Sequence, residues 1–175
     1  LAQDVDLTAQ AGDVQAFSSV TLIDLSSVTQ GTNIITATGG SVNLTDISDT
    51  SSDDATAPVE LEINADTNAT LDSISIENLL DINLVDAGAS VLQADEALLA
   101  GTMTVDGDGT DDTFNFADAV TTDTATITIN QANVVDFNAD VTAKTSLTIT
   151  NVNTEVDLAQ DVDLTAQAGD VQAFS

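Results

Sequence analysis

The sequence predicts an all-β protein that is wound as a parallel β-solenoid with three strands in each coil. Three observations support this prediction. Short segments alternate apolar and polar residues with a period of two, similar segments recur at a spacing of about 22 residues, and the residues between them are mostly Asp, Asn, Gly, Ser and Thr. A helical period occurs only in a brief run at 95–101. Right-handed coiling is expected, because parallel strands are connected that way by default.

The first strand of each coil is predicted from segments that start whole multiples of this spacing apart. These segments are PVELEIN, TMTVDGD, TATITIN and SLTITNV, which begin at residues 58, 102, 124 and 146. The spacing places residues in three inward columns: Leu61, Val105, Ile127, Ile149 and Val171, with Ile82 and Leu84 in a slipped row; Ile76, Leu98, Val120, Thr142 and Leu164; and Leu92, Phe114, Asp136 and Leu158. In the third column Phe137 is expected to replace Asp136 through a one-residue bulge. Three columns predict three faces.

A longer repeat is also present. Residues 1–18 recur without change as residues 158–175, which indicates a 157-residue tandem repeat. We interpret residues 1–157 as one full unit of a continuous solenoid and residues 158–175 as the start of the next identical unit. The length of this repeat equals six coils at the regular spacing and one coil that is three residues longer. The sequence therefore predicts about seven coils per unit. The three extra residues are placed in the polar segment 48–57.

The charge of the chain excludes several classes of function. The 175 residues include 30 Asp and Glu but a single Lys, and the formal net charge is −29. Nucleic acids and anionic membranes are not expected partners, because both are bound through clusters of basic residues. The chain has no His, Cys, Trp or Tyr, which removes the usual nucleophile–base pairs, so an enzyme is not expected. The sequence also lacks a run of 18 apolar residues that would predict a transmembrane helix.

Asx residues are predicted to stack at one corner of the coil. They follow the first strand of successive rows at the regular spacing and are Asn64, Asp86, Asp108 and Asn130. Asn and Asp adopt the left-handed backbone conformation and hydrogen-bond to their own main chain, which suits a solenoid turn. A structural role is therefore preferred, and cation binding is the alternative because the two central members are acids.

Other carboxylates are candidate calcium ligands. One column, which has the same regular spacing, consists of Glu96, Asp118 and Asp140. The densest acidic segment, DGDGTDDTFNF at 106–116, supplies Asp106, Asp108, Asp111 and Asp112. Stacked carboxylates repel one another by roughly 3 kcal/mol per pair at an effective dielectric near 20, and hard oxygen ligands favour Ca²⁺ as the ion that relieves this repulsion. The alternative is that these acids point into solvent and salt screens them.

Parts of the sequence resemble known secreted repeat proteins. The Gly-x-Gly and Asp-Asp-Thr-Phe elements of 106–116 resemble the calcium-binding nonapeptides of RTX-type proteins, which implies that Asp112 matches the ligand Asp and Phe114 the inward apolar residue. Asp108 and Gly109 would lie in the turn, and Thr110 stands where that motif has Gly. The phrases GDVQAFSSVTLIDLSS and GGSVNLTDIS are similar to the β-helical repeats of filamentous haemagglutinin-like adhesins, and GTDDTFNFADAV is similar to segments of surface-layer proteins. These resemblances imply a bacterial or archaeal protein located outside the cell or at its surface.

The expected function is structural, as a repeat of a long extracellular fibre, adhesin stalk or surface layer that stacks end to end and that calcium stiffens. The expected partners are adjacent identical units and, through divalent cations, neighbouring fibres. Two alternatives remain open. Ice or mineral binding would use an outward array of Thr102, Thr104, Thr124, Thr126, Thr128, Ser146, Thr148 and Thr150. A polysaccharide-cleaving enzyme would use pairs of Asp as acid and base.

Overall fold

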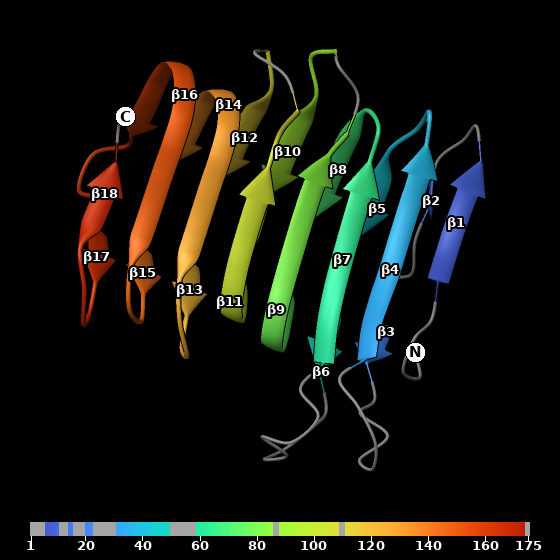
Figure 1. Cartoon of the computed structure of the whole chain (residues 1–175), viewed down its shortest axis with the longest axis horizontal. Coiled ribbons are helices and arrows are strands. Elements are labelled where there is room, and N and C mark those ends of the chain that lie inside the picture. Colours follow the sequence, from blue (N-terminus) through green and yellow to red (C-terminus); the bar gives the residue numbers. More distant parts are fainter. Residues whose placement is uncertain are drawn as a thin grey trace.

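The computed structural model describes residues 6–10, 14–15, 20–22, 31–49, 59–85, 88–108 and 111–173. Their strands pair in parallel, and none of these residues is helical (Figure 1). The strands wind into stacked coils, and the chain completes about five turns between Val59 and Ala166. The predicted all-β, parallel β-solenoid is therefore confirmed.

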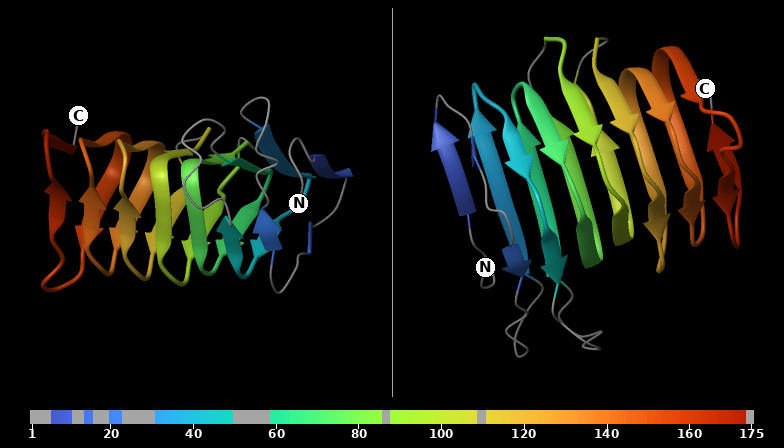
Figure 2. Two further views of the ribbon diagram at one scale, coloured as in Figure 1. Left: turned by 90° about the horizontal axis from the view of Figure 1, so that it is seen from below. Right: turned by 180° about the vertical axis from the view of Figure 1, so that it is seen from behind.

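The register of the strands sorts them into three faces, which run along the stack side by side (Figure 2). Face one contains β1 (Asp6–Gln10), β4 (Gly31–Thr38), β7 (Val59–Ala65), the second parts of β9 (Ile74–Leu84) and β11 (Leu98–Asp106), the first parts of β14 (Ile127–Phe137) and β16 (Leu147–Leu158), and β18 (Val171–Ala173). Face two contains β2 (Val14–Gln15), β5 (Val42–Leu44), β8 (Asn68–Leu71), β10 (Val91–Ala94), β12 (Thr113–Phe116) and the second parts of β14 and β16. Face three contains β3 (Val20–Leu22), β6 (Ile47–Asp49), the first parts of β9 and β11, β13 (Val120–Thr122), β15 (Val141–Ala143) and β17 (Leu164–Ala166). Each coil thus has three strands, as the three apolar columns predict.

Four long strands continue across a corner instead of ending at it. β9 and β11 pass from face three to face one, and β14 and β16 pass from face one to face two. The bend in β11 lies at Gly101, where an added Cβ would be 2.3 Å from the carbonyl oxygen of Glu77, so only glycine allows the two backbones to approach this closely. At the corner between faces one and two, Gly39, Gln131 and Asn151 have φ of 67°, 58° and 54°. This left-handed conformation turns the chain sharply enough to begin the next face.

The inward side chains of the three faces form one continuous apolar core. On face two, Leu92, Phe114 and Val135 are register neighbours and are fully buried. In the adjacent column the rings of Phe116 and Phe137 stack with their centroids 5.2 Å apart. Phe137 therefore points inward as expected. Asp136 lies between two inward residues and faces outward, so Val135 rather than Phe137 is the neighbour of Phe114.

Coil length varies along the stack. The chain advances by 19 positions from Asn64 to its register partner Asn83, by 24 from Asp106 to Asn130, and by 28 from Thr32 to Glu60. The longest of these coils includes the segment 48–57, where the sequence predicts an insertion, and residues 50–58 lie outside the described part of the chain. A second coil of the same length, from Asp6 to Ile34, is not predicted by the row arithmetic.

The unequal coils correct several positions in the predicted columns. Met103 and Leu147, not Val105 and Ile149, lie in the column of Ile127. On face three, Ile74 rather than Ile76 is the partner of Leu98, and Val141 rather than Thr142 is the partner of Val120. A constant spacing misassigns these positions because the corners contain different numbers of residues. A shift of two residues exchanges neighbouring inward positions, as for Met103 and Val105, and a shift of one, as for Val141 and Thr142, reverses which side chains point inward.

The two identical segments lie on different faces. In the first copy, Asp6–Gln10 forms β1 on face one and Val14–Gln15 forms β2 on face two. In the second copy, the equivalent residues form β17 on face three and β18 on face one. The same sequence is therefore compatible with more than one side of the coil.

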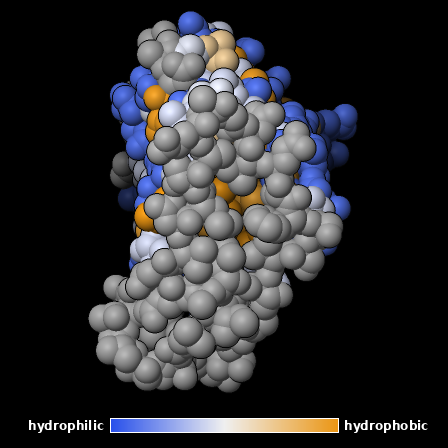
Figure 3. Space-filling model, turned by 90° about the vertical axis from the view of Figure 1, so that its right-hand side faces the viewer, coloured by the Kyte–Doolittle hydropathy of each residue, from blue (hydrophilic) through white to orange (hydrophobic). Residues whose placement is uncertain are grey.

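The β1 end of the stack is shown in Figure 3. Hydrophilic residues lie along both sides of this view, and hydrophobic residues are visible between them. This arrangement agrees with an apolar interior that is enclosed by polar outer surfaces.

Candidate functional site

Asp112, the residue that matches the RTX-type ligand position, is fully buried at the corner between faces one and two. Its Oδ1 accepts the N–H of Ser90 in the preceding coil at 3.0 Å, and its Oδ2 accepts the N–H of Asp108 at 3.2 Å. Its main-chain oxygen accepts the N–H of Asn133 in the following coil at 2.7 Å. Asp112 therefore joins three successive coils through main-chain donors. The two N–H donors to the carboxylate stabilise its charge in this buried place.

The other members of the predicted calcium set are less buried than Asp112. Asp106 lies on the outer side of face one, where its Oδ1 accepts Asn130 Nδ2 at 2.9 Å and Gln131 Nε2 at 3.1 Å. Asp108 and Asp111 are exposed. Within the described residues, no three His, Cys, Asp or Glu side chains come together in a group that could hold a metal ion. The predicted calcium site stays a prediction.

The predicted column of Glu96, Asp118 and Asp140 is interrupted by a one-residue shift. Main-chain hydrogen bonds at the corner between faces two and three mark equivalent positions, which are held by Ala97, Ala119 and Asp140. Glu96 and Asp118 each precede this position by one residue and so match each other, whereas Asp140 does not match them. Asp140 Oδ1 instead accepts the N–H of Asp163 in the next coil at 3.0 Å. All three acids are exposed, as the solvated alternative expects.

The polar ladder at the end of face one has different members from the predicted turn ladder. Its register partners are Thr36, Asn64, Asn83, Asp106, Asn130 and Thr150. Asn83 Nδ2 donates to Asn64 Oδ1 at 3.1 Å, and Asn130 Oδ1 accepts Thr150 Oγ1 at 3.1 Å. The predicted members Asn64 and Asn130 are present, Asp108 lies beyond the end of β11, and Asp86 is outside the described residues. The short coil before Asn83 is the reason that the regular spacing misses it.

The predicted threonine array is only three coils long. Thr104, Thr128 and Thr148 are register partners on the outer side of face one. Asp81 and Glu62 take the equivalent positions before them, and Gln172 follows. Thr150 aligns with Asn130, Thr102 aligns with Leu79, and Thr124 and Thr126 lie outside the strands.

A second ladder of amides, on face two, is absent from the sequence predictions. Asn115 Nδ2 donates to Gln93 Oε1 at 2.8 Å, and Asn138 Nδ2 donates to Asn115 Oδ1 at 3.0 Å. Gln93 Nε2 in turn donates to Asp95 Oδ1 at 2.7 Å. Gln93 and Asn115 are separated by the regular spacing, so the pattern that predicts the strands contains the signal for this pair.

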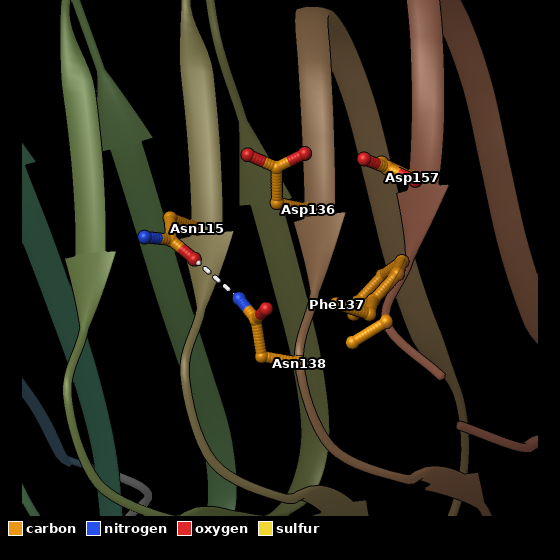
Figure 4. Close-up of a pocket in the computed structure, with 6 residues that line it drawn as sticks. Asn115, Asp136, Phe137, Asn138 and Asp157 are labelled. Atoms are coloured by element: carbon orange, nitrogen blue, oxygen red, sulfur yellow. Dashed lines mark hydrogen bonds between the residues drawn. The ribbon is translucent and has the colours of Figure 1, made fainter. Parts of the chain in front are cut away.

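A shallow pocket of about 190 Å³ lies beside the amide ladder (Figure 4). It is lined by Asn115, Asp136, Phe137, Asn138, Asp157 and Ala159. Asp136 and Asp157 are register partners in adjacent coils. Burial raises the pKa of Asp136, and the charge of Asp157 raises this pKa further. The lining offers oxygen acceptors and no basic group, so it suits a hydrated cation or a ligand with hydroxyl groups better than an anion.

The acids on the outer side of face one also interact across coils. Burial raises the pKa of Asp81, and the neighbouring charges of Glu62, Asp106 and Glu60 raise it further, while the hydrogen bond from Asn83 lowers it. The part of face one around Asp81 therefore carries a cluster of like charges.

Comparison with known proteins gives no relative. No protein-family model matches the chain, and no curated protein or solved structure matches it significantly. In the described part of the chain, no helix has the length and apolar character needed to cross a membrane.

Proposed function

We propose that the chain is a structural repeat of a long extracellular fibre, adhesin stalk or surface layer, in which identical units continue one another as an acidic β-solenoid. Its role is mechanical rather than enzymatic. The similarity of several phrases to secreted solenoid repeats supports the extracellular location.

The observation that carries this proposal is the loss of core burial in the last coil. Ala94, Phe116 and Phe137 are at most 1% exposed, but Leu158, the next member of their column, is 40% exposed. On face one, Ile127 and Leu147 are fully buried, and their partner Val171 is 41% exposed. Val156 and Leu164 show the same loss of burial. These apolar residues are positioned to receive another coil, since open solenoid ends are normally covered by a cap or a further repeat.

The repeated segment and the charge support the same proposal. Residues 158–175 are identical to residues 1–18, so one unit leads directly into the sequence that begins another. A net charge of −29 keeps parallel fibres apart and leaves divalent cations to bridge them. Calcium as the stiffening ion, ice or mineral binding and polysaccharide cleavage stay predictions from the sequence alone.

The substitution Leu158→Ala tests the proposal in two chains: residues 1–175, and a two-unit chain of residues 1–157 followed by residues 1–175. In the two-unit chain a further coil would cover Leu158, and the substitution should lower the free energy of unfolding by about 2–5 kcal/mol. In the single chain, where this side chain is 40% exposed, the loss should stay below about 1 kcal/mol. Urea unfolding followed by circular dichroism measures both.

Leu92→Ala is the matched control. Leu92 is fully buried inside the stack, so its truncation should cost the same in both chains. An equally small loss for Leu158→Ala in both chains would contradict end-to-end stacking.

A further inference from the structure

Face one contains an unbroken series of seven register steps that leads from Leu7 to Ala173. The intermediate partners are Ile35, Ile63, Ile82, Val105, Ile129 and Ile149. Seven coils therefore advance the chain from position 7 to position 173. The 157-residue sequence repeat would reach only position 164, which is nine residues short. Nine residues correspond to one strand and its corner, or about a third of a coil.

The second copy of the repeated segment shows the effect of these missing residues. Leu164 is the copy of Leu7, but Leu164 pairs with Val141 on face three, whereas Leu7 pairs with Ile35 on face one. Both copies place this leucine in register with a buried residue, so the register position is an inward one in both. The segment keeps its inward pattern while its face changes, because the alternation of apolar and polar residues is the same on every side of the coil.

We propose that each 157-residue unit is rotated by one face, about a third of a turn, relative to the unit before it. The structure also supplies the contacts of the junction, because the first copy is seen with its next coil in place. The free edge of β17 would pair with a strand that has the sequence of β4, since β1 pairs with β4. The free edge of β18 would pair with the sequence of β5, since β2 pairs with β5. This inference rests on the proposed end-to-end stacking.

The rotation determines how charge is distributed along the fibre. The acidic cluster that includes Glu62 and Asp81 lies on face one of this unit and would lie on a different face of the next. The same side would carry it again only after three units. Three units of about six and two-thirds coils make about 20 coils, or about 96 Å at roughly 4.8 Å per coil. Each side of the fibre would then present face one, face two and face three of successive units, one after another along its length.

Disulfide cross-linking in the two-unit chain tests the rotation, and the absence of natural Cys keeps the background low. One cysteine of each pair is placed in the second unit, whose Thr8 occupies the position of Thr165 of the first, and the other is placed in the first unit. The proposal expects Thr8→Cys of the second unit to cross-link with Thr142→Cys of the first, because Thr165 pairs with Thr142 on face three. It also expects Gln15→Cys of the second unit to cross-link with Thr148→Cys of the first, because Gln172 pairs with Thr148 on face one. Paired strands lie about 4.8 Å apart, which is within reach of a disulfide. The measurement is the loss of both free thiols by mass spectrometry after mild oxidation.

A unit with a whole number of coils would instead return Thr8 of the second unit to face one, in the column that ends at Thr150 of the first unit. Thr8→Cys of the second unit would then cross-link with Thr150→Cys of the first and would not react with Thr142→Cys. That result would overturn the rotation and leave end-to-end stacking intact. Absence of every cross-link, in variants that keep a β-type circular dichroism spectrum, would overturn both the rotation and the stacking.

Discussion

At the scale of single residues, Asp112 shows how an acid can serve the core of a highly acidic protein. It is fully buried, and its carboxylate accepts main-chain donors from Ser90 in the preceding coil and from Asp108 in its own turn. Gly107 lies against it, since an added Cβ there would be 2.5 Å from Asp112 Oδ2. The buried carboxylate thus holds the corner that follows β11 in place through its hydrogen bonds to the main chain.

We expect Asp112→Asn to lower the free energy of unfolding by about 1–3 kcal/mol. The new amide nitrogen would face a main-chain N–H donor and leave it without an acceptor in a buried place. The exposed neighbour Asp111 is the control, and Asp111→Asn should change the free energy by no more than about 0.5 kcal/mol. Equal effects of the two substitutions in urea unfolding would contradict the bonding role of Asp112.

Asp81 represents the opposite case, an acid whose charge opposes folding. Its folded-state pKa lies above the ordinary value of 3.8, because burial and the charges of Glu62, Asp106 and Glu60 disfavour ionisation. The folded state therefore binds this proton more tightly than the unfolded state. The stabilisation from the protonated group is complete below pH 3.8 and is lost as the pH rises through the folded-state pKa.

This linkage predicts that mild acidification stabilises the protein. The thermal midpoint should rise as the pH is lowered from 7 toward 4, and Asp81→Asn should reduce this rise. At pH 7 the same substitution should increase the free energy of unfolding by roughly 0.5 kcal/mol, because it removes a charge from a cluster of like charges. Thermal melts at several pH values measure both effects. A wild-type midpoint that falls throughout this range would be inconsistent with the raised pKa.

At the scale of elements, the strands are specified by the local alternation of apolar and polar residues. The number of residues in each corner determines which residues of successive coils pair. The strands alternate inward and outward residues, and ladders of side-chain amides align successive coils, as in Gln93, Asn115 and Asn138. The corners differ from coil to coil, and some require a backbone approach that only glycine permits. Gly101 and Gly169 are examples, since an added Cβ at either would lie 2.3 Å from a carbonyl oxygen of another coil.

Gly101→Ala should therefore lower the free energy of unfolding by about 1–3 kcal/mol, as expected when extra volume is forced into a packed site. The new methyl group would contact the carbonyl oxygens of Glu77 and Asn78, which are main-chain atoms and cannot rotate away. Urea unfolding provides the measurement. An unchanged midpoint would mean that coils at this corner lie farther apart than the structure has them.

At the scale of the whole molecule, stability depends on keeping many like charges on a narrow stack. The chain carries 30 acids and one Lys, and its coils place outward acids such as Asp136 and Asp157 directly above one another. Neither charge neutralisation by basic residues nor disulfides can offset this repulsion, because the chain has one basic residue and no Cys. Screening by dissolved salt and the binding of cations can still reduce this repulsion.

Salt and calcium can be separated by experiment. Raising the monovalent salt concentration to about 0.15 M shortens the screening length to about 8 Å, and the thermal midpoint should rise. The calcium prediction requires a further rise with millimolar Ca²⁺ at matched ionic strength, which excess chelator should reverse. Equal midpoints in Ca²⁺ and in monovalent salt of the same ionic strength would contradict calcium binding and leave screening as the sole effect.

The candidate sites show where prediction from the sequence succeeds and where it stops. Asn64 and Asn130 both belong to the polar ladder at the end of face one, where Asn64 lies near the end of β7 and Asn130 precedes the corner residue Gln131. Asn83 is missed because the coil before it is shorter than the regular spacing. Gln93 and Asn115 keep this spacing, so their pairing is predictable from the sequence, whereas Asn138 lies one residue beyond it.

The class of fold, the three faces and the tandem repeat can all be predicted from the linear chain. Alternation with a period of two, turn residues and identity between segments are all present in the linear chain. The register depends on the folded structure. With it come the outward position of Asp136, the burial of Asp112 and the different faces of the two identical segments. The physical reason is that each corner takes up its own number of residues according to its backbone conformation and packing. When a constant spacing is assumed, the error in the expected register grows from coil to coil. In the folded protein each strand aligns directly with its neighbour through main-chain pairing, so the register does not depend on a constant coil length.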